Sequence, residues 1–75
     1  MNIKRIIGDN IRGFRHRMNW TQEKLAVRSK LSPDYIGRLE RGQKNIGAEN
    51  LVRIAKALKI DPYLILKEDS YKNIL

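Results

Sequence analysis

Side chains able to hydrogen-bond to bases or phosphates recur at helical spacing between Ser32 and Arg41. At roughly 100° per residue, Asp34, Arg38 and Arg41 share one side of a helix with Gly37. The Arg38 guanidinium offers paired donors that match guanine O6 and N7, or the oxygens of a phosphate. The Asp34 carboxylate can accept from cytosine N4, or can stabilise the helix N-terminus. Both alternatives stay open for each side chain.

Two short helices joined by a tight turn would position this face. Thr21 can cap a helix over residues 22–29, because its hydroxyl can accept from a free amide of the first turn. Ser32 followed by Pro33 starts a second helix at once, since serine caps well and proline has a helical φ. Gly42 ends this helix, because glycine accepts the left-handed conformation.

The inner sides of these two helices are apolar or small. Ile36 and Leu39 lie opposite the polar side of the second helix, and the first contributes Leu25, Ala26 and Ser29. Residues 21–42 therefore predict a helix-turn-helix whose second helix has a polar, basic outer face, which is typical of a surface that enters the DNA major groove.

The composition limits the classes of function that remain. The chain has 75 residues, enough for one domain with a modest core, and no cysteine for disulfides or thiolate metal sites. Its one histidine, His16, stands between two arginines, and no carboxylate cluster or glycine-rich phosphate loop appears. We therefore expect that the protein is not an enzyme and that it binds no cofactor or metal. We also expect neither a membrane span nor a signal peptide, and a location in the cytoplasm.

The positive charge is concentrated in the first half of the chain. Residues 1–44 hold 11 Lys and Arg against 4 Asp and Glu, or +7, whereas residues 45–75 hold 5 against 4, or +1. Together these give the net charge of +8. Such an asymmetric field suits phosphate neutralisation, although a solvated face that maintains solubility is the plainer explanation of charge alone.

Three further helices complete an all-α, five-helix domain over residues 1–66. The first, over 3–18, has one apolar stripe, and Asn19 is the expected left-handed residue after it. Periodic apolar residues predict a fourth helix over 48–58, and Asp61 followed by Pro62 starts a fifth over 63–66. The stripe of the first helix comprises Ile3, Ile7, Ile11, Phe14 and Met18.

The fifth helix carries four successive apolar residues: Tyr63, Leu64, Ile65 and Leu66. Because a short surface helix cannot turn all four toward its own core, we expect part of this segment to contact a second subunit. The tail, residues 67–75, receives no firm secondary structure, and its Ile74 and Leu75 are candidates to extend the same dimer interface.

The strings Thr21–Ala26, Leu31–Ser32, Tyr35–Ile36 and Arg38–Gly42 resemble the Cro and phage-repressor (XRE) family of helix-turn-helix proteins. The resemblance extends over residues 3–66. Members of similar size include restriction-modification controller proteins, phage and mobile-element repressors, and antitoxin-type regulators. The family implies a compact lambda-repressor-like domain that binds a palindromic operator in double-stranded DNA as a homodimer.

The resemblance also assigns roles. Gln22 corresponds to a glutamine that holds a phosphate and braces the recognition helix, and Arg15 and Glu40 to a structural ion pair that joins the first and third helices. The candidate base-contacting residues are Ser32, Pro33, Asp34, Gly37 and Arg38. The candidate phosphate-contacting residues are Thr21, Gln22, Tyr35, Arg41, Gln43, Lys44 and Asn45.

Two residues depart from the family pattern. Gly37 stands where a small hydroxyl residue is common in the family. Glycine lowers the stability of a helix by roughly 1 kcal/mol relative to alanine. We propose that glycine is present here because the helix approaches DNA closely. Pro33 stands where many members carry a polar side chain that contacts a base. Because the proline side chain has no polar atom, it can offer only apolar contact, for example to a thymine methyl.

The leading hypothesis is a sequence-specific transcriptional regulator, most simply a repressor or autoregulator. The alternative is an antitoxin-like module that neutralises a protein partner and binds DNA only secondarily. Such modules carry long disordered arms, whereas only 67–75 follow the fifth helix here.

Overall fold

The computed structural model describes residues 1–72, so the expected contribution of Ile74 and Leu75 lies outside the described residues. Within residues 1–72 five α-helices follow one another and there is no strand, which confirms the all-α prediction. The helices are α1 (Ile3–Arg17), α2 (Gln22–Ser29), α3 (Pro33–Glu40), α4 (Ala48–Leu58) and α5 (Tyr63–Leu66), followed by a 3-10 turn, η1 (Ser70–Lys72).

The predicted caps are present on both helices of the helix-turn-helix. Thr21 Oγ1 accepts from the Lys24 amide at 3.0 Å, and Ser32 Oγ accepts from the Tyr35 amide at 3.1 Å. Asn19 and Gly42 adopt φ of 59° and 71° respectively, as expected for residues that end helices. Local hydrogen-bonding chemistry therefore fixes the boundaries of α2 and α3.

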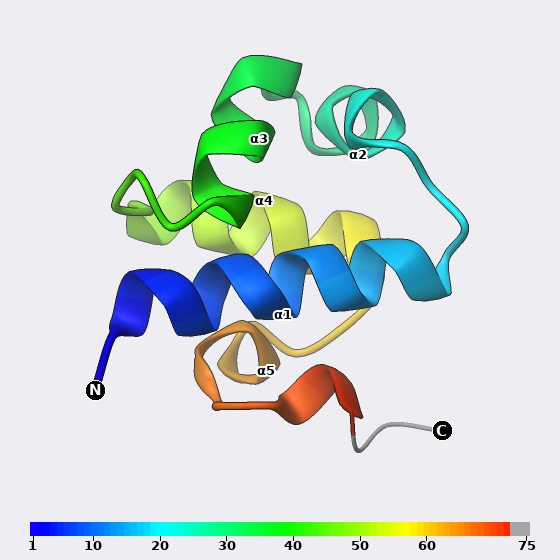
Figure 1. Ribbon diagram of the computed structural model, residues 1–75. Helices are drawn as coiled ribbons and strands as arrows, with labels where there is room; N and C mark the ends of the chain where they lie inside the picture. Colours follow the sequence, from blue (N-terminus) through cyan, green and yellow to red (C-terminus); the bar gives the residue numbers. More distant parts are fainter. Residues whose placement is uncertain (73–75) are drawn as a thin grey trace.

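Helix α1 lies between two layers of the domain (Figure 1). Helix α3 packs on one side of α1, with α2 beside α3 and against α4, while α5 and η1 pack on the opposite side. The shared core contains Ile7, Ile11, Phe14, Leu25, Ile36, Leu39, Ile54, Leu58 and Ile65. Ile3 belongs to the predicted stripe but is exposed, because it is the first residue of α1 and extends beyond the elements that cover the helix.

Gly8 allows α1 and α3 to approach closely. A Cβ at this position would overlap the backbone carbonyl oxygens of Leu39 and Glu40 at the end of α3. Backbone atoms cannot rotate aside as a flexible side chain can, so any larger residue would force the two helices apart. The absent side chain of Gly8 thus sets the position of the α3 C-terminus.

Residues 67–72 are more ordered than the sequence analysis expected. Asn10 is fully buried in α1, and its Nδ2 donates to the carbonyls of Ile65 and Lys67, both at 2.8 Å. Ser70 Oγ donates to the Leu64 carbonyl, and the Tyr71 ring lies on Gly13 of α1. Side-chain contacts with distant parts of the chain hold this segment in place, and no local sequence pattern predicts them.

The structure contradicts the prediction that Ile65 contributes to the dimer interface. Ile65 is fully buried in the core of its own subunit and cannot contact a second copy. Leu64 is half-buried against the same core, whereas Tyr63 and Leu66 keep exposed fractions of 59% and 40%. The candidate interface on α5 therefore reduces to the exposed side chains of Tyr63 and Leu66, with the edge of Leu64.

None of the helices in the described part of the chain is long and apolar enough to cross a membrane.

Candidate nucleic-acid interface

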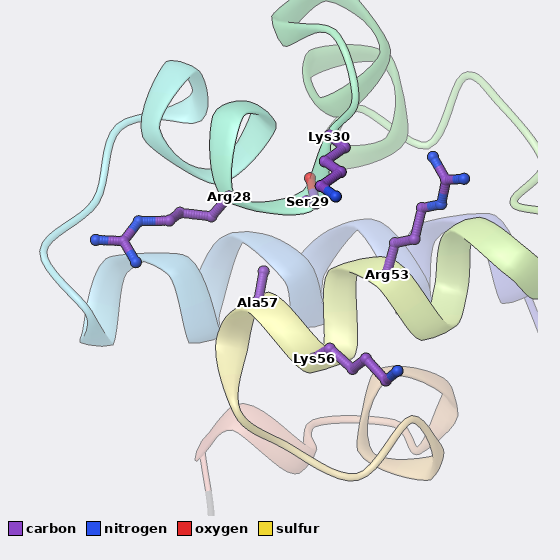
Figure 2. A pocket seen from close by; sticks show the side chains of 6 residues that line it. All are labelled: Arg28, Ser29, Lys30, Arg53, Lys56 and Ala57. Atoms are coloured by element: carbon purple, nitrogen blue, oxygen red, sulfur yellow. The ribbon is translucent and has the colours of Figure 1, made fainter.

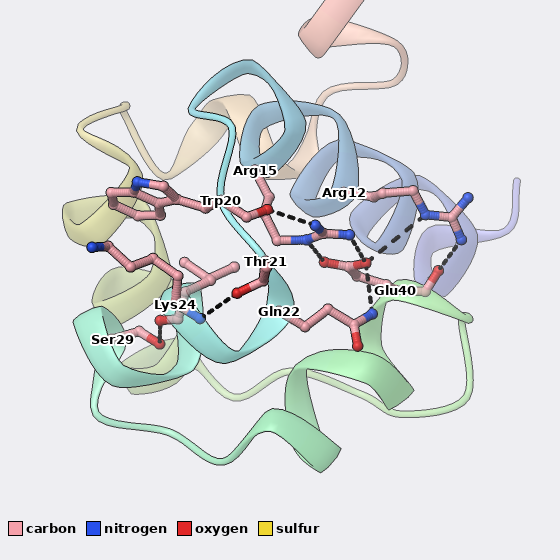
Figure 3. Close-up of polar contacts among 9 residues, drawn as sticks. Arg12, Arg15, Trp20, Thr21, Gln22, Lys24, Ser29 and Glu40 are labelled. Atoms are coloured by element: carbon pink, nitrogen blue, oxygen red, sulfur yellow. Dashed lines mark hydrogen bonds and ion pairs between the residues drawn. The ribbon is translucent and has the colours of Figure 1, made fainter.

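A buried ion pair fixes the inner side of α3 against α1 (Figure 3). Arg15 Nε and Nη2 donate to the two carboxylate oxygens of Glu40 at 2.7 and 2.8 Å, in a bidentate arrangement. Arg15 Nη1 donates to the Trp20 carbonyl at 2.8 Å. Glu40 is only 1% exposed, so the Arg15–Glu40 pair implied by the resemblance is present and largely removed from water.

Two more side chains converge on Glu40. Gln22 Nε2, at the start of α2, donates to Glu40 Oε1 at 3.0 Å. Arg12 Nη2 donates to the Glu40 carbonyl at 3.5 Å, and Arg12 Nε lies 3.9 Å from Oε1. Glu40 therefore links α1, α2 and α3, and Gln22 braces α3 as the resemblance implies (Figure 3).

Arg12 is a member of this cluster that the sequence analysis missed. It precedes Arg15 by three residues on α1, so both guanidinium groups lie on the same face of the helix. That spacing is a signal that could have identified it. Arg12 remains about half exposed, with its side chain at 47%, so it combines a contact to Glu40 with a charge that faces solvent.

The outer side of α3 carries the candidate base-reading side chains. Ser32 and Pro33 are exposed at the start of the helix. Arg38 Nε lies 3.0 Å from Asp34 Oδ2, one helical turn away, and the two side chains are 55% and 71% exposed. Asp34 thus restrains the Arg38 guanidinium on the exposed side of α3, where both can reach a ligand.

The candidate phosphate contacts surround this face. Arg41 Nε donates to Gln43 Oε1 at 3.1 Å, and Lys44 and Asn45 follow as exposed residues of the loop. Tyr35 is half-buried, and its hydroxyl accepts from Asn50 Nδ2 of α4 at 3.1 Å. Thr21 and Gln22 lie at the other flank, at the N-terminus of α2. Asn50 was not predicted as a partner, because nothing in the sequence marks a pairing across 15 residues.

The structure gives Gly37 surroundings that the sequence analysis did not predict. This residue is buried rather than open to a base, because the side chains of Gln22 and Arg41 cover it. A Cβ on Gly37 would lie 3.2 Å from Arg41 Nη1 and 3.4 Å from Gln22 Oε1. The missing side chain makes room for two neighbouring polar groups within the same subunit.

Replacing Gly37 with alanine should raise the free energy of unfolding by about 0.5–1 kcal/mol, because alanine is the better helix former and both neighbours can shift their flexible ends. We expect the affinity for DNA to change by less than twofold. Urea denaturation and fluorescence anisotropy would measure these quantities. A tenfold or greater loss of affinity at unchanged stability would instead establish that the helix backbone approaches DNA at Gly37.

The chain is similar in sequence to known helix-turn-helix and control proteins. A protein family described as Helix-turn-helix matches residues 11–65. Control protein C.SmaI of Serratia marcescens is 38% identical over 73 residues, which cover 97% of this chain and 87% of that protein. Control protein C.BamHI of Bacillus amyloliquefaciens is 39% identical over 62 residues, which cover 81% of this chain and 76% of that protein.

Solved structures show the same fold. The restriction-modification controller protein C.AhdI from Aeromonas hydrophila superposes with a TM-score of 0.81 at 35% identity, covering 83% of this chain and 94% of that one. The DNA-binding domain of the P22 C2 repressor superposes with a TM-score of 0.79 at 32% identity, covering 84% of this chain and 83% of that one.

Proposed function

This chain belongs to the Helix-turn-helix family, and on that premise we propose that it is a sequence-specific transcriptional regulator that binds double-stranded DNA. The observation that carries the proposal is the two-sided construction of α3. Its inner side is fixed to α1 and α2 through Glu40, while Asp34 and Arg38 remain exposed on its outer side. A rigid helix with an exposed donor and acceptor set is what reading of base edges requires.

In the proposed complex, α3 lies in the major groove. The residues that face the bases are Ser32, Pro33, Asp34 and Arg38. Phosphates are contacted on one flank by Arg41, Gln43, Lys44 and Asn45. The other phosphate contacts are made by Thr21, Gln22 and Tyr35. The Asp34–Arg38 pair supports this arrangement because it limits the orientations that the Arg38 guanidinium can adopt before binding. Less rotamer entropy is then lost when the guanidinium meets a base.

We further propose that two copies bind an inverted repeat. A two-fold dimer places its recognition helices in successive major grooves, about 34 Å apart. The exposed apolar side chains of Tyr63 and Leu66 on α5 support a subunit interface there. The similarity to proteins named as control proteins and as a restriction-modification controller protein supports a regulator of restriction-modification genes, most simply a repressor or autoregulator.

Replacing Arg38 with alanine should weaken operator binding by about 1–3 kcal/mol and relax the preference at one base position. The matched control is Arg5→Ala, because Arg5 also pairs with an acid on its own helix, with Arg5 Nη1 3.8 Å from Asp9 Oδ1, but lies on α1. Binding would be measured against an operator and its single-base variants. An equal loss on every duplex would assign Arg38 to a phosphate instead.

Replacing Leu66 with lysine should convert the dimer to a monomer at micromolar concentration without unfolding the chain, since this side chain is already 40% exposed. Analytical ultracentrifugation would measure the change. Val27→Lys makes the same chemical change at an exposed apolar residue of α2, where the exposed fraction is 75%, and should leave the association state unaltered. A Leu66→Lys variant that sediments as the parent does would remove α5 from the interface.

A further inference from the structure

A cavity of about 360 Å³ lies between the C-terminal end of α2 and the side of α4 (Figure 2). Its volume falls in the range of small-molecule sites, roughly 300–1,000 Å³. The lining residues are Arg28, Ser29, Lys30, Arg53, Lys56 and Ala57. Four of these six residues are cations and none is an acid. Their charged ends point in different directions around the cavity, and the Arg28 guanidinium extends away from the other three (Figure 2).

The packing of α2 on α4 brings these cations together from distant parts of the sequence. Arg28 and Lys30 come from the end of α2, and Arg53 and Lys56 come from α4. Arg28 is partly compensated, because its guanidinium carbon lies 5.5 Å from the centroid of the Trp20 ring. Arg53 Nη2 lies 3.8 Å from Glu49 Oε1.

The two lysines lack such compensation. No ion pair joins Lys30 or Lys56 to a carboxylate within residues 1–72. A lysine ammonium without a carboxylate partner is available to pair with an anion. Lys30 and Lys56 are therefore the two cations of the cavity that an anionic ligand can engage without breaking an existing contact.

Lys30 adds a second observation. It ends α2 in the left-handed conformation, with φ 61° and ψ 40°, where glycine would be free of strain. Lys59 ends α4 in nearly the same conformation, with φ 61° and ψ 42°, but does not line the cavity. Lys30 and Lys59 are therefore matched in backbone geometry and charge, but only Lys30 lines the cavity.

We propose that this cavity is a phosphate-binding site separate from the recognition face. The ligand carries several phosphate oxyanions, which accept from the lysine ammonium and arginine guanidinium groups. Gln22 lies at the opposite end of α2, an eight-residue helix with a length of roughly 12 Å, so this site is distinct from the phosphate contact proposed for Gln22. The phosphates are those of a DNA backbone or of a free polyphosphate compound.

The first test titrates the DNA-free protein with inorganic triphosphate at constant ionic strength and follows backbone amide shifts by NMR. We expect saturable shifts at residues 28–30 and 53–57. The double variant Lys30→Gly/Lys56→Ala should bind at least tenfold more weakly, whereas the control Lys59→Gly/Lys4→Ala, with the same backbone relief and loss of charge, should change less than twofold. Shifts confined to other residues, or equal affinities for both variants, would overturn the proposal.

A second titration, in the presence of saturating duplex, identifies the source of the phosphate. If the DNA backbone fills the cavity, triphosphate no longer shifts these amides. The double variant then removes four lysine–phosphate contacts per dimer and makes the slope of log affinity against log salt shallower by about 3–4. If a free compound fills it, the shifts persist on DNA and the slope does not change. Because the first titration contains no DNA, failure of operator binding would leave its result intact.

Discussion

Replacing Glu40 with alanine should lower the free energy of unfolding by about 3–5 kcal/mol. The Arg15 guanidinium is nearly buried, with its side chain 10% exposed, and would lose both of its short hydrogen bonds to the carboxylate. Gln22 would lose its acceptor at the same time. Because a small domain has only about 5–15 kcal/mol of stability, much of the variant would unfold in mild urea.

Two variants give this result its meaning. Glu49→Ala removes a carboxylate of α4 that is 81% exposed and pairs with Arg53 at 3.8 Å, so we expect a change below about 0.5 kcal/mol. Arg15→Met/Glu40→Met removes both buried charges while keeping apolar volume, and should recover most of the loss. Urea denaturation followed by circular dichroism would measure all three. A loss below 1 kcal/mol for Glu40→Ala would show that the buried pair does not hold α3 in place.

Affinity for the operator should fall about 10⁴-fold when salt rises from about 50 to 200 mM. About 8 phosphate contacts per dimer give a slope of log affinity against log salt near −7, because each neutralised phosphate releases about 0.9 of a counterion. The net charge of +8 per chain and the exposed cations next to α3 support a steep dependence.

Fluorescence anisotropy with a labelled operator, repeated at several salt concentrations, would measure this slope. A duplex of unrelated sequence should show a similar slope at lower affinity, since phosphate contacts carry no sequence information. A slope shallower than about −2 would argue against DNA as the partner of this basic surface.

Helix boundaries could be predicted from the sequence because they depend on local chemistry. Thr21 and Ser32 accept from amides of their own helices, and Asn19 and Gly42 tolerate the left-handed backbone, so each feature is determined within a few residues. The inward faces of α2 and α3 could also be predicted, because helical periodicity places Ile36 and Leu39 opposite Arg38.

Other features could not be predicted because they depend on contacts between distant segments. A four-residue helix has too little periodicity to show that Ile65 faces inward, and the fold decides it by packing α5 on α1. The order of residues 67–72 depends on Asn10, more than 50 positions earlier. Gly37 appeared open because helical geometry alone does not show that Gln22 and Arg41 cover it.

The most direct test of sequence-specific, dimeric DNA binding is selection of random duplexes by the purified protein at about 0.15 M salt, followed by sequencing of the retained molecules. We predict enrichment of an inverted repeat whose half-sites lie about one helical turn apart, with one base position that loses its preference in the Arg38→Ala variant. Failure to enrich any sequence with the folded protein would contradict the proposed function.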